Sequence, residues 1–340
     1  MGEPLISIVI VNWNGLRFLK GCLGSIYSEG FEPVEVIFVD NGSTDSSVEF
    51  VRKNYPAALV IENAENLGFA RANNQGIKKA AGKYVLTLNN DTVLERGFLK
   101  ELAGAAEAGS EKTGMWAVKI LSFDERDVID SVGGLLIYPD GLAKGRGRLE
   151  KDSGQYDRAE EVFIPSACAG LYRRSMLDEV GLFDEDFFAY CEDTDLGLRA
   201  RLAGWKTVSV PKAVVYHYYS GTGGRYTAFK AYLVERNHLW VAFKNFPLRL
   251  LVLFPFYTKW RLIVQAYGIL AGRGAGGRFE GSKSELVKVL FKAYIGALGS
   301  LPAVLSKRRA IRKKRAVDAK EALSWFRTYG ISAKELVLKD

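Results

Sequence analysis

The first hundred residues alternate between apolar runs and segments with helical spacing. The apolar runs are rich in Ile and Val, as strands buried on both faces of a parallel sheet usually are. The segments between them repeat apolar residues every three or four positions, which is typical of amphipathic helices. The pattern therefore predicts strands over residues 5–11, 34–39, 58–61 and 84–88, and helices over residues 16–28 and 68–80 and after a cap at Ser43 or Thr44.

The pattern becomes less regular after residue 90 but keeps the same two kinds of element. Residues 113–165 contain short strand-like runs separated by turns, which predicts antiparallel additions to the sheet. The alternation as a whole predicts an α/β fold with a mainly parallel, Rossmann-like central sheet. Further helices are expected over residues 95–108, 194–203 and 228–246, and further strands over 207–210 and 213–218.

The chain becomes strongly apolar from residue 247. Residues 250–258 and 262–272 form two apolar segments separated by a Lys-Trp-Arg tripeptide, and residues 286–305 form a third. The first two segments are shorter than the roughly 20 apolar residues that a membrane-spanning helix needs. Aromatic residues beside Lys and Arg are typical of helices that lie in the lipid headgroup region. The alternative is a soluble helical subdomain with a solvated basic face.

Charge is divided unevenly along the chain. Residues 241–340 carry 20 Lys/Arg and 6 Asp/Glu, whereas residues 1–240 have a net charge of −6. A basic tail on an acidic body indicates an anionic partner, either a nucleic acid or a membrane surface. The basic run at 307–315 has no interleaved aromatic residues, which argues against nucleic acid and favours anionic lipid. We therefore expect an α/β domain over 1–240 and a basic, amphipathic, membrane-interfacial region over 241–340.

The cysteines and the N-terminal segment indicate the compartment. The three cysteines are scattered without CxxC spacing, which fits a reducing environment and argues against a disulfide framework or a zinc site. The N-terminal segment runs directly into a strand without the pattern of a signal peptide. We expect a cytoplasmic protein, peripheral on the cytoplasmic face of the cell membrane.

Polar residues follow each of the first strands. In an open α/β sheet, the carboxyl ends of the strands are where ligands bind. Amide and carboxylate oxygens there suit Mg²⁺ or Mn²⁺ and the hydroxyl groups of a nucleotide. Each residue alone has a simpler interpretation, because Asn and Asp also form turns and caps, but together they predict one nucleotide site. The candidates are Asn12, Asn14, Asp40, Asn66, Arg71, Asn73, Asn89, Asn90 and Asp91.

Three further groups are candidates for chemistry. Glu192 and Asp193 lie among aromatic residues, where a partly desolvated carboxylate has a pKa suited to a general base; the alternative is a helix cap. His217 could complete a metal site. Arg225 belongs to the Gly-rich loop that follows His217, and that loop could close over a phosphate. His238, within a helix, is expected to be structural.

At this point the chain resembles a known family. The runs IVIVNWNG, VDNGSTD, ENLGFARANNQG, LTLNNDT and GLFDEDFFAYCEDTDLGLRARLAGW are similar to those of family 2 glycosyltransferases, in particular a rhamnosyltransferase-like branch, over about residues 5–240. The resemblance implies a GT-A fold, a nucleotide-sugar donor, a divalent metal and inversion at the anomeric carbon.

The resemblance also assigns roles to single residues. It implies that Asp40 contacts the nucleoside, that Asp91 is the metal-binding last residue of a DXD motif, and that Asp193 is the base of an ED motif. It makes His217 a metal ligand of some members, and it matches Arg236 and the following Asn to an RN pair. The DXD motif here reads Asn-Asn-Asp, so only one carboxylate remains, and the QxxRW motif of processive synthases is not found.

The resulting hypothesis is a metal-dependent transfer of one or a few sugars. The donor is expected to be dTDP-rhamnose or a UDP-sugar, and the acceptor a hydroxyl of a glycan, lipid-linked, in cell-surface polysaccharide or cell-wall synthesis. One alternative is a sugar-nucleotide pyrophosphorylase, but the N-terminal segment lacks the basic Gly-rich loop such an enzyme needs. The other is a non-catalytic protein that binds membrane or nucleic acid, which leaves Asp40, Asp91 and Asp193 unexplained.

Overall fold

A computed structural model describes residues 3–219, 224 and 226–339 of the chain. Its centre is one ten-stranded mixed sheet in which β10, β12, β6, β11, β4, β1, β2 and β3 follow one another, with β5 paired to β12 and β7 to β6. The strands are β1 (Ile6–Asn12), β2 (Val34–Asp40), β3 (Leu59–Glu62), β4 (Tyr84–Asn89), β5 (Thr92–Leu94), β6 (Thr113–Ser122), β7 (Ile129–Val132), β10 (Glu161–Val162), β11 (Ala169–Arg173) and β12 (Lys206–His217); β8 (Leu135–Ile137) and β9 (Ala143–Gly145) form a separate hairpin.

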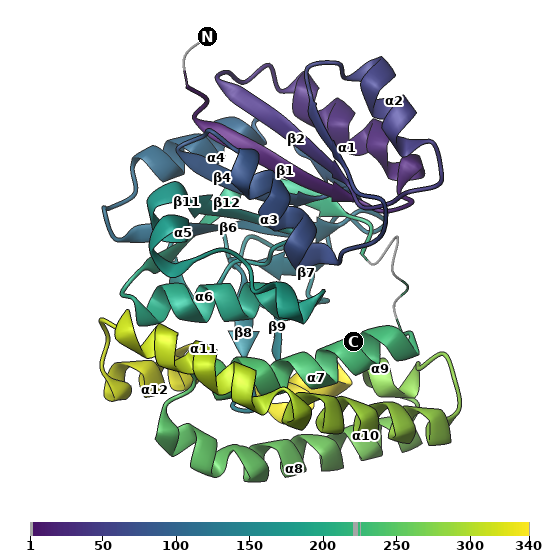
Figure 1. The fold of residues 1–340 in the computed structure, drawn as a ribbon, viewed down its shortest axis with the longest axis vertical. Helices are drawn as coiled ribbons and strands as arrows, with labels where there is room; N and C mark the ends of the chain where they lie inside the picture. Colours follow the sequence, from purple (N-terminus) through teal and green to yellow (C-terminus); the bar gives the residue numbers. More distant parts are fainter. Residues whose placement is uncertain (1–2, 220–223, 225, 340) are drawn as a thin grey trace.

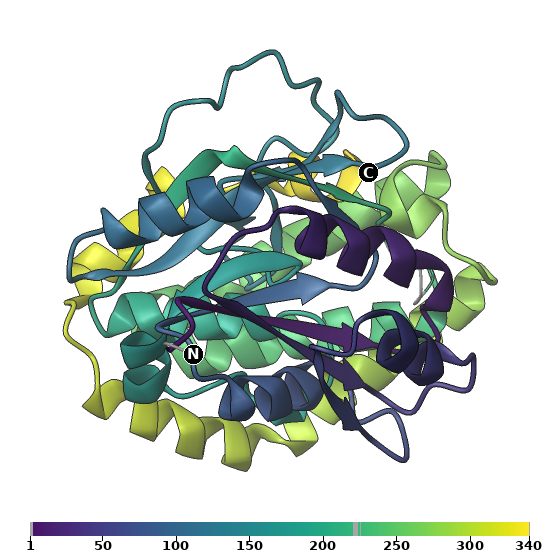
Figure 2. The ribbon, with the colours of Figure 1, turned by 90° about the horizontal axis from the view of Figure 1, so that it is seen from above.

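Helices cover both faces of the sheet and form a further layer at one end (Figures 1 and 2). Those that pack on the sheet are α1 (Leu16–Ser28), α2 (Ser47–Asn54), α3 (Phe69–Lys79), α4 (Phe98–Glu107), α5 (Arg174–Val180) and α6 (Glu192–Leu202). The end layer consists of α7 (Ala228–Asn245), α8 (Leu248–Leu270), α9 (Gly274–Gly277), α10 (Lys283–Gly299), α11 (Leu301–Lys313), α12 (Ala319–Thr328) and α13 (Ala333–Leu338).

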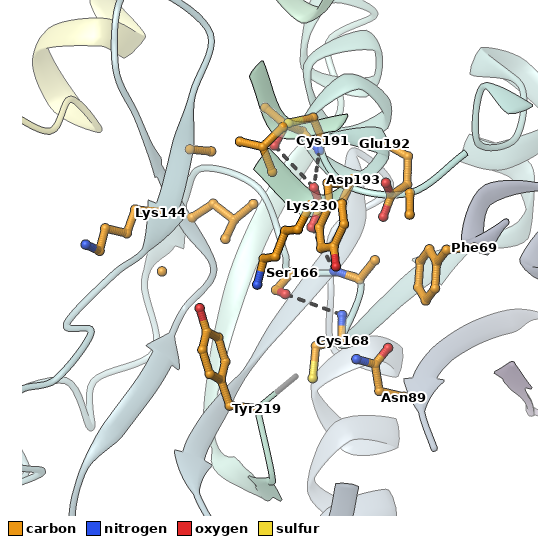
Figure 3. Close-up of a pocket in the computed structure, with 18 of the residues that line it drawn as sticks. Phe69, Asn89, Lys144, Ser166, Cys168, Cys191, Glu192, Asp193, Tyr219 and Lys230 are labelled. Carbon is orange, nitrogen blue, oxygen red and sulfur yellow. Dashed lines mark hydrogen bonds between the residues drawn. The ribbon is translucent and has the colours of Figure 1, made fainter. Parts of the chain in front are cut away.

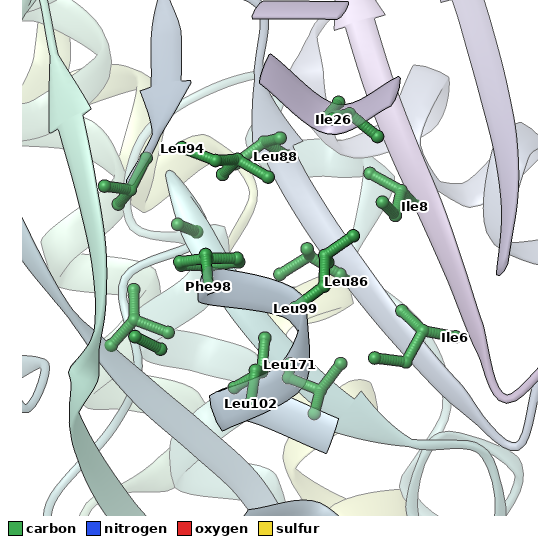
Figure 4. Close-up of a cluster of buried hydrophobic side chains, with 14 of the residues drawn as sticks. Ile6, Ile8, Ile26, Leu86, Leu88, Leu94, Phe98, Leu99, Leu102 and Leu171 are labelled. Atoms are coloured by element: carbon green, nitrogen blue, oxygen red, sulfur yellow. The ribbon is translucent and has the colours of Figure 1, made fainter. Parts of the chain in front are cut away.

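The alternation of β1 explains why the sheet is buried on both sides. Ile6, Ile8 and Ile10 point into the core under α1 and α4 (Figure 4), whereas Val9 points into the opposite core under α3 and α6. The expected α/β class with a largely parallel sheet is confirmed, since β1 pairs in parallel with both β2 and β4. The antiparallel additions expected within residues 113–165 are the pairs β6–β7 and β8–β9. β11, which the sequence pattern did not predict, runs antiparallel between β4 and β6.

Two local predictions are wrong. The cap of α2 is not Ser43 or Thr44, because the helix begins at Ser47 and the Ser43 hydroxyl accepts a hydrogen bond from Asn14 N at 2.9 Å. The two strands expected after residue 206 form one strand, β12, which continues through a register shift between Val210 and Val214. The two apolar segments after residue 247 form the single helix α8, with Pro255 inside it.

The end layer is packed onto the rest of the chain through a shared core. Phe163 beside β10 and Leu198 of α6 lie in one apolar cluster with Trp240 of α7 and Trp325 of α12. An isolated bridge joins Ile137 of β8 to Gly330, just before α13. In Figure 1 this layer lies below the sheet, with α8 outermost. The boundary at residue 240 stays a prediction.

α8 has an unusual distribution of side chains between its two faces. Its inner face carries Arg261, which is 1% exposed and donates hydrogen bonds to Glu235 and Asp140. Its outer face carries exposed apolar residues such as Phe256, Trp260 and Leu270, with exposed fractions of 71%, 52% and 78%. Within the described part of the chain, no single helix has the length and composition of a membrane span; α10 and α11, bent by 58°, meet that test only as a pair.

Candidate active site

The register of the parallel strands brings the first polar strand ends together. Asn12 pairs with Asp40 across β1 and β2, and Val11 pairs with Asn89 across β1 and β4. Asn12 Nδ2 donates to Asp40 Oδ1 at 3.2 Å, and Asn90 Nδ2 donates to Asn12 Oδ1 at 2.6 Å. These side chains therefore form one hydrogen-bonded row along the carboxyl edge of the sheet, as the sequence predicts.

The backbone of Gly15 packs against the side chains of this row, and a larger residue would not fit there. A Cβ atom at residue 15 would lie 2.1 Å from Asn90 Nδ2 and 2.5 Å from Asn12 Oδ1. Such distances are far below van der Waals contact, so a side chain there would break the row. Gly15 thus keeps α1 close to the strand ends.

A second polar group lies at the adjacent end of β12. Because His217 pairs with Thr92 in the register of β12 and β5, its Nε2 lies 3.3 Å from Asp91 Oδ1. On its other side, His217 Nδ1 lies 2.7 Å from Asp130 Oδ2, which β7 supplies. A carboxylate that binds one ring nitrogen fixes the orientation of the other, an arrangement common around protein-bound metals.

The electrostatics of this group favour a positive charge. Burial by itself lowers the pKa of His217, but Cys168, Asp130 and Asp91 together raise it well above its usual value. Asp130 in turn has a lowered pKa although burial opposes this, because it lies beside His217 and Arg148. The carboxylates of Asp91 and Asp130 would also favour a divalent cation, which would bind the neutral imidazole in place of its proton.

Glu192 and Asp193 begin α6 and differ in their surroundings. Asp193 accepts hydrogen bonds from Ala167 N at 3.2 Å and from Thr194 N at 2.7 Å. Burial raises the pKa of Asp193, and these backbone donors partly oppose the rise. Glu192 is only 5% exposed, and its Oε2 has no hydrogen-bond partner among the described residues. Burial and the neighbouring Asp193 raise the pKa of Glu192 well above its usual value.

The loop before α6 is strained and held by two residues of α7. Phe188, Tyr190 and Cys191 have positive φ angles of 64°, 69° and 68°, which non-glycine residues adopt rarely and at a cost. Asn237 Nδ2 lies within 3.0 Å of three carbonyl oxygens of this loop, and Arg236 Nη2 donates to two carbonyls at its start. The Arg236-Asn237 pair therefore fixes the backbone that leads into Glu192 and Asp193.

One large pocket, with a volume of about 980 Å³, is lined by Asp91, His217, Glu192 and Asp193. It extends from the strand ends to the end layer, where Lys230, Glu235 and Arg261 line it together with Leu336 and Val337 of α13. Figure 3 shows Asp193, Lys230 and Tyr219 around the same space. The predicted residues that line the pocket are Asn66, Asn89, Asn90, Asp91, Glu192, Asp193 and His217.

Other predicted residues are placed outside the pocket wall. Asn12 donates to Asp40 and to the Ser43 hydroxyl, and Thr44 N donates to Asn14 Oδ1 at 2.8 Å. These residues therefore hold the Ser43–Thr44 turn. Asn73 donates to the carbonyl of Phe69 within α3. Arg71 lies 3.7 Å from Glu185 at the surface, and Arg236 binds loop carbonyls. Arg225 lies outside the described residues.

Sequence reasoning did not find several residues of the pocket. Asp130, Lys230 and Tyr219 have no motif around them, and only the pairing of β7 with β6 and of β6 with β12 brings Asp130 to His217. Arg148, also missed, lies over the Tyr219 ring at 4.1 Å and pairs with Asp130. His238 is fully buried behind Arg261, as expected for a structural residue.

The comparison with protein families agrees with this geometry. Residues 7–181 match the family model described as glycosyl transferase family 2. The chain belongs to this family. It is therefore a glycosyltransferase that uses a nucleotide-sugar donor, which excludes the pyrophosphorylase and the non-catalytic alternatives.

Relatives with curated names are similar over most of the chain. The N-acetylglucosaminyl-diphospho-decaprenol L-rhamnosyltransferase of Mycobacterium tuberculosis is 28% identical over 257 residues, which cover 65% of this chain and 78% of the relative. An uncharacterised glycosyltransferase of Bacillus subtilis is 30% identical over 227 residues, covering 66% of this chain and 77% of that protein.

Solved structures at lower identity share the fold. Residues 1–349 of Staphylococcus aureus TarS with UDP-GlcNAc give a TM-score of 0.56 at 18% identity, covering 96% of this chain and 90% of that one. The structure of GalNAc-T7 with UDP, GalNAc and Mn²⁺ gives a TM-score of 0.57 at 16% identity. The match covers 86% of this chain and 55% of that one. The expected GT-A architecture is thereby confirmed, whereas membrane association is not tested by these structures.

The residues present fit a divalent metal that relies on the donor for most of its ligands. Within the described ranges there is no group of three His, Cys, Asp or Glu side chains that could hold a metal ion. Asp91 and His217 supply one oxygen and one nitrogen side by side. Mg²⁺ usually binds through one or two carboxylates and takes its other ligands from water and phosphate, so a two-residue site is sufficient.

Proposed function

We propose that this glycosyltransferase inverts the anomeric carbon of its donor, with Asp193 as general base and a Mg²⁺ or Mn²⁺ ion held by Asp91 and His217. The observation that carries the proposal is that these three residues line one pocket at the carboxyl edge of the sheet. When bound, the metal would stabilise the charge that develops on the leaving nucleoside diphosphate.

Asp130 and Asp193 then have different roles in the reaction. Asp130 holds the His217 ring through Nδ1, so that Nε2 faces Asp91. Asp193 removes the proton of the acceptor hydroxyl as its oxygen attacks the anomeric carbon. The raised pKa of Asp193, caused by burial, makes it a stronger base than an exposed carboxylate. Glu192, whose pKa burial also raises, remains the alternative base.

The row of Asn12, Asp40 and Asn90 supports the nucleoside side of the pocket. Asn66, Asn89 and Asn90 are the amides that line it and would contact the donor. Asn14, Arg71, Asn73 and Arg225 stay candidates from their places in the sequence, and Arg236 stays a candidate from the resemblance. The donor is proposed to be dTDP-rhamnose, in line with the name of the mycobacterial relative, with a UDP-sugar as the second candidate.

A donor screen tests this function. We expect dTDP-rhamnose to raise the melting temperature of the full chain when Mn²⁺ is present, because a ligand stabilises the folded state that binds it. Hydrolysis of the same donor without acceptor should need the metal. If no dTDP- or UDP-sugar shifts the melting temperature or is hydrolysed, the proposed donor class is wrong.

The acceptor is proposed to be a lipid-linked glycan at the cytoplasmic membrane face. The name of the mycobacterial relative contains such an acceptor, and the outer face of α8 is apolar. α10 adds exposed Val287, Phe291 and Leu298. We call the exposed apolar side chains of α8 and α10 the apolar face.

The basic run of α11 has fewer charges available for a membrane surface than its sequence indicates. Lys307 pairs with Asp184 and Asp186, and Arg308 donates to the carbonyls of Phe243 and Phe246. Arg309, Arg312 and Lys313 remain exposed and available for anionic headgroups. Binding of the full chain to vesicles that contain anionic lipid, compared with neutral vesicles, tests the membrane proposal; equal or absent binding to both would contradict it.

A further inference from the structure

A second cavity, of about 600 Å³, opens on the outer side of the end layer. Its walls come from three helices, since Phe243 lies on α7, Tyr294 on α10, and Phe254, Leu262 and Ile263 on α8. α10 packs mainly against α7, whereas α8 packs mainly against α9 and α13. The space between α8 and α10 is therefore a groove whose floor is α7.

The groove is suited to a hydrocarbon chain. Its walls are almost entirely carbon, and the ring centroids of Phe243 and Phe254 lie 5.6 Å apart. Thr258 of α8 adds a buried hydroxyl with no hydrogen-bond partner among the described residues, and a variant described below tests whether a polar occupant uses it. The groove opens within the apolar face, next to Ile263, which is 51% exposed.

Charge around the groove matches a lipid with an anionic head. Exposed Arg249 and Lys259 lie on α8, and exposed Lys288 and Lys292 lie on α10. Each cation stands beside apolar side chains of the same helix, the arrangement of helices that rest in the headgroup region of an anionic membrane.

One residue pair separates the groove from the active-site pocket. Tyr294 lines the groove, and its hydroxyl lies 3.5 Å from Arg261 Nη2. Arg261 in turn lines the large pocket that contains Asp193. The groove and the pocket are therefore neighbours, with this contact between them.

We propose that the groove between α8 and α10 binds the hydrocarbon chain of the lipid-linked acceptor. The proposal rests on the lipid-linked acceptor proposed above and adds a chain-binding site to it. The groove would make the enzyme favour acceptors with long chains, because each methylene group buried contributes roughly 0.8 kcal/mol, or about fourfold in affinity.

Filling the groove tests the proposal. Ala266 lines the groove and is exposed, so Ala266→Trp adds bulk there without entering the core. We expect the KM for a decaprenyl-diphosphate-linked N-acetylglucosamine to rise by more than tenfold, which corresponds to roughly two lost methylene contacts. The kcat/KM for the same sugar diphosphate carrying an ethyl group should not change. Ala319→Trp, at an exposed alanine of α12 outside the groove, is the matched control.

A second variant distinguishes a hydrocarbon chain from a polar occupant. Thr258→Val removes the unpartnered hydroxyl at nearly constant volume and should leave the KM for the decaprenyl acceptor unchanged or lower it. A rise as large as that of Ala266→Trp would overturn the proposal in favour of a polar ligand. Equal effects of Ala266→Trp on both acceptors, or no effect on the decaprenyl acceptor, would also overturn it.

Direct binding separates failure of this proposal from failure of the proposed function. Decaprenyl diphosphate, supplied in detergent micelles, should bind the wild-type chain at least tenfold more tightly than Ala266→Trp. If that difference is found but no sugar is transferred to either acceptor, the groove stands and the proposed acceptor is wrong. If transfer is found without the difference in binding, the acceptor class stands and the groove is wrong.

Discussion

The sheet edge and the end layer both bury ionic groups, but they satisfy them differently. At the sheet edge, Glu192 Oε2 has no hydrogen-bond partner among the described residues, and the Asp91 carboxylate faces the imidazole of His217 across 3.3 Å. In the end layer, Arg261 is matched by Glu235, Asp140 and Gln265.

This difference separates binding groups from structural ones. A buried polar atom without a partner costs free energy, so it persists where a ligand or a reaction uses it. A buried ion pair with all its donors used has no capacity left for a ligand and fixes the positions of the helices that carry it. The predictions below test that division, from the largest expected effect to the smallest.

Replacing the proposed base should have the largest effect. Asp193→Asn should lower kcat by about 10²–10⁴-fold while leaving the Kd of the donor near normal, because a general base acts on the acceptor. In the wild-type enzyme, kcat/KM should fall as the pH drops through the raised pKa of Asp193, since protonation removes the base. Donor binding by calorimetry and initial rates measure both.

Asp178→Asn is the control for this prediction, because Asp178 is an exposed acid on α5. It should leave kcat unchanged. A loss of donor affinity in Asp193→Asn would instead make Asp193 a donor ligand and Glu192 the better candidate for the base.

Breaking the ion pair of the end layer should affect stability. Arg261→Leu leaves Glu235 and Asp140 buried without their cation, which should lower the free energy of unfolding by about 3–5 kcal/mol. Urea unfolding followed by circular dichroism measures the change. Arg249→Leu, at an exposed arginine of the same helix, should change stability by less than about 0.5 kcal/mol. A loss below about 1 kcal/mol in Arg261→Leu would show that the pair is not structural.

Removing the carboxylate that orients the His217 ring should have a smaller effect, and it should act on the affinity for Mn²⁺. Asp130→Asn removes the charge that holds Nδ1 and should weaken the affinity for activating Mn²⁺ by about 10–100-fold. The concentration of Mn²⁺ that gives half-maximal activity measures this. Asp124→Asn changes an exposed acid and should leave that concentration unaltered. An unchanged Mn²⁺ requirement in Asp130→Asn would remove His217 from the metal site.

A single change on the apolar face should have the smallest effect. Phe256→Ser should weaken binding to anionic vesicles by about tenfold, because a partly buried Phe contributes near the lower end of 1.5–3 kcal/mol. Co-sedimentation with vesicles measures it. Leu59→Ser alters an exposed apolar residue on β3, away from this face, and should not change binding. Equal losses in both variants would point to non-specific adhesion.

The sequence predicts most of the sheet edge because the necessary information there is local. β1, α1 and β4 each have a clear hydrophobic period, and parallel strands place their polar ends together without further assumptions. Asn12, Asp40 and Asn90 are brought together in this way. Asp130 could not be found because its position depends on the pairing of β7 with β6 and of β6 with β12, and β6 and β12 are far apart in the sequence.

The end layer was harder to predict because Arg261 is turned inward. Arg261 lies in a Lys-Trp-Arg tripeptide that resembles an exposed break between two apolar segments. Its partners come from α7 and from the turn after β8, and no local pattern indicates those contacts. Arg and Lys are good helix formers, so the tripeptide is compatible with the single helix α8, which runs from Leu248 to Leu270.

The position of α13 has a practical consequence for preparing the enzyme. Leu336 and Val337 form part of the pocket wall, and Lys144 Nζ donates to the carbonyl of Leu336 at 3.1 Å. In Figure 1 the N-terminus is marked above the sheet, on the side away from the end layer. A tag attached after α13 would therefore begin near the pocket, whereas a tag attached before β1 would begin away from it. Kinetic constants measured on the two fusions should not be treated as interchangeable.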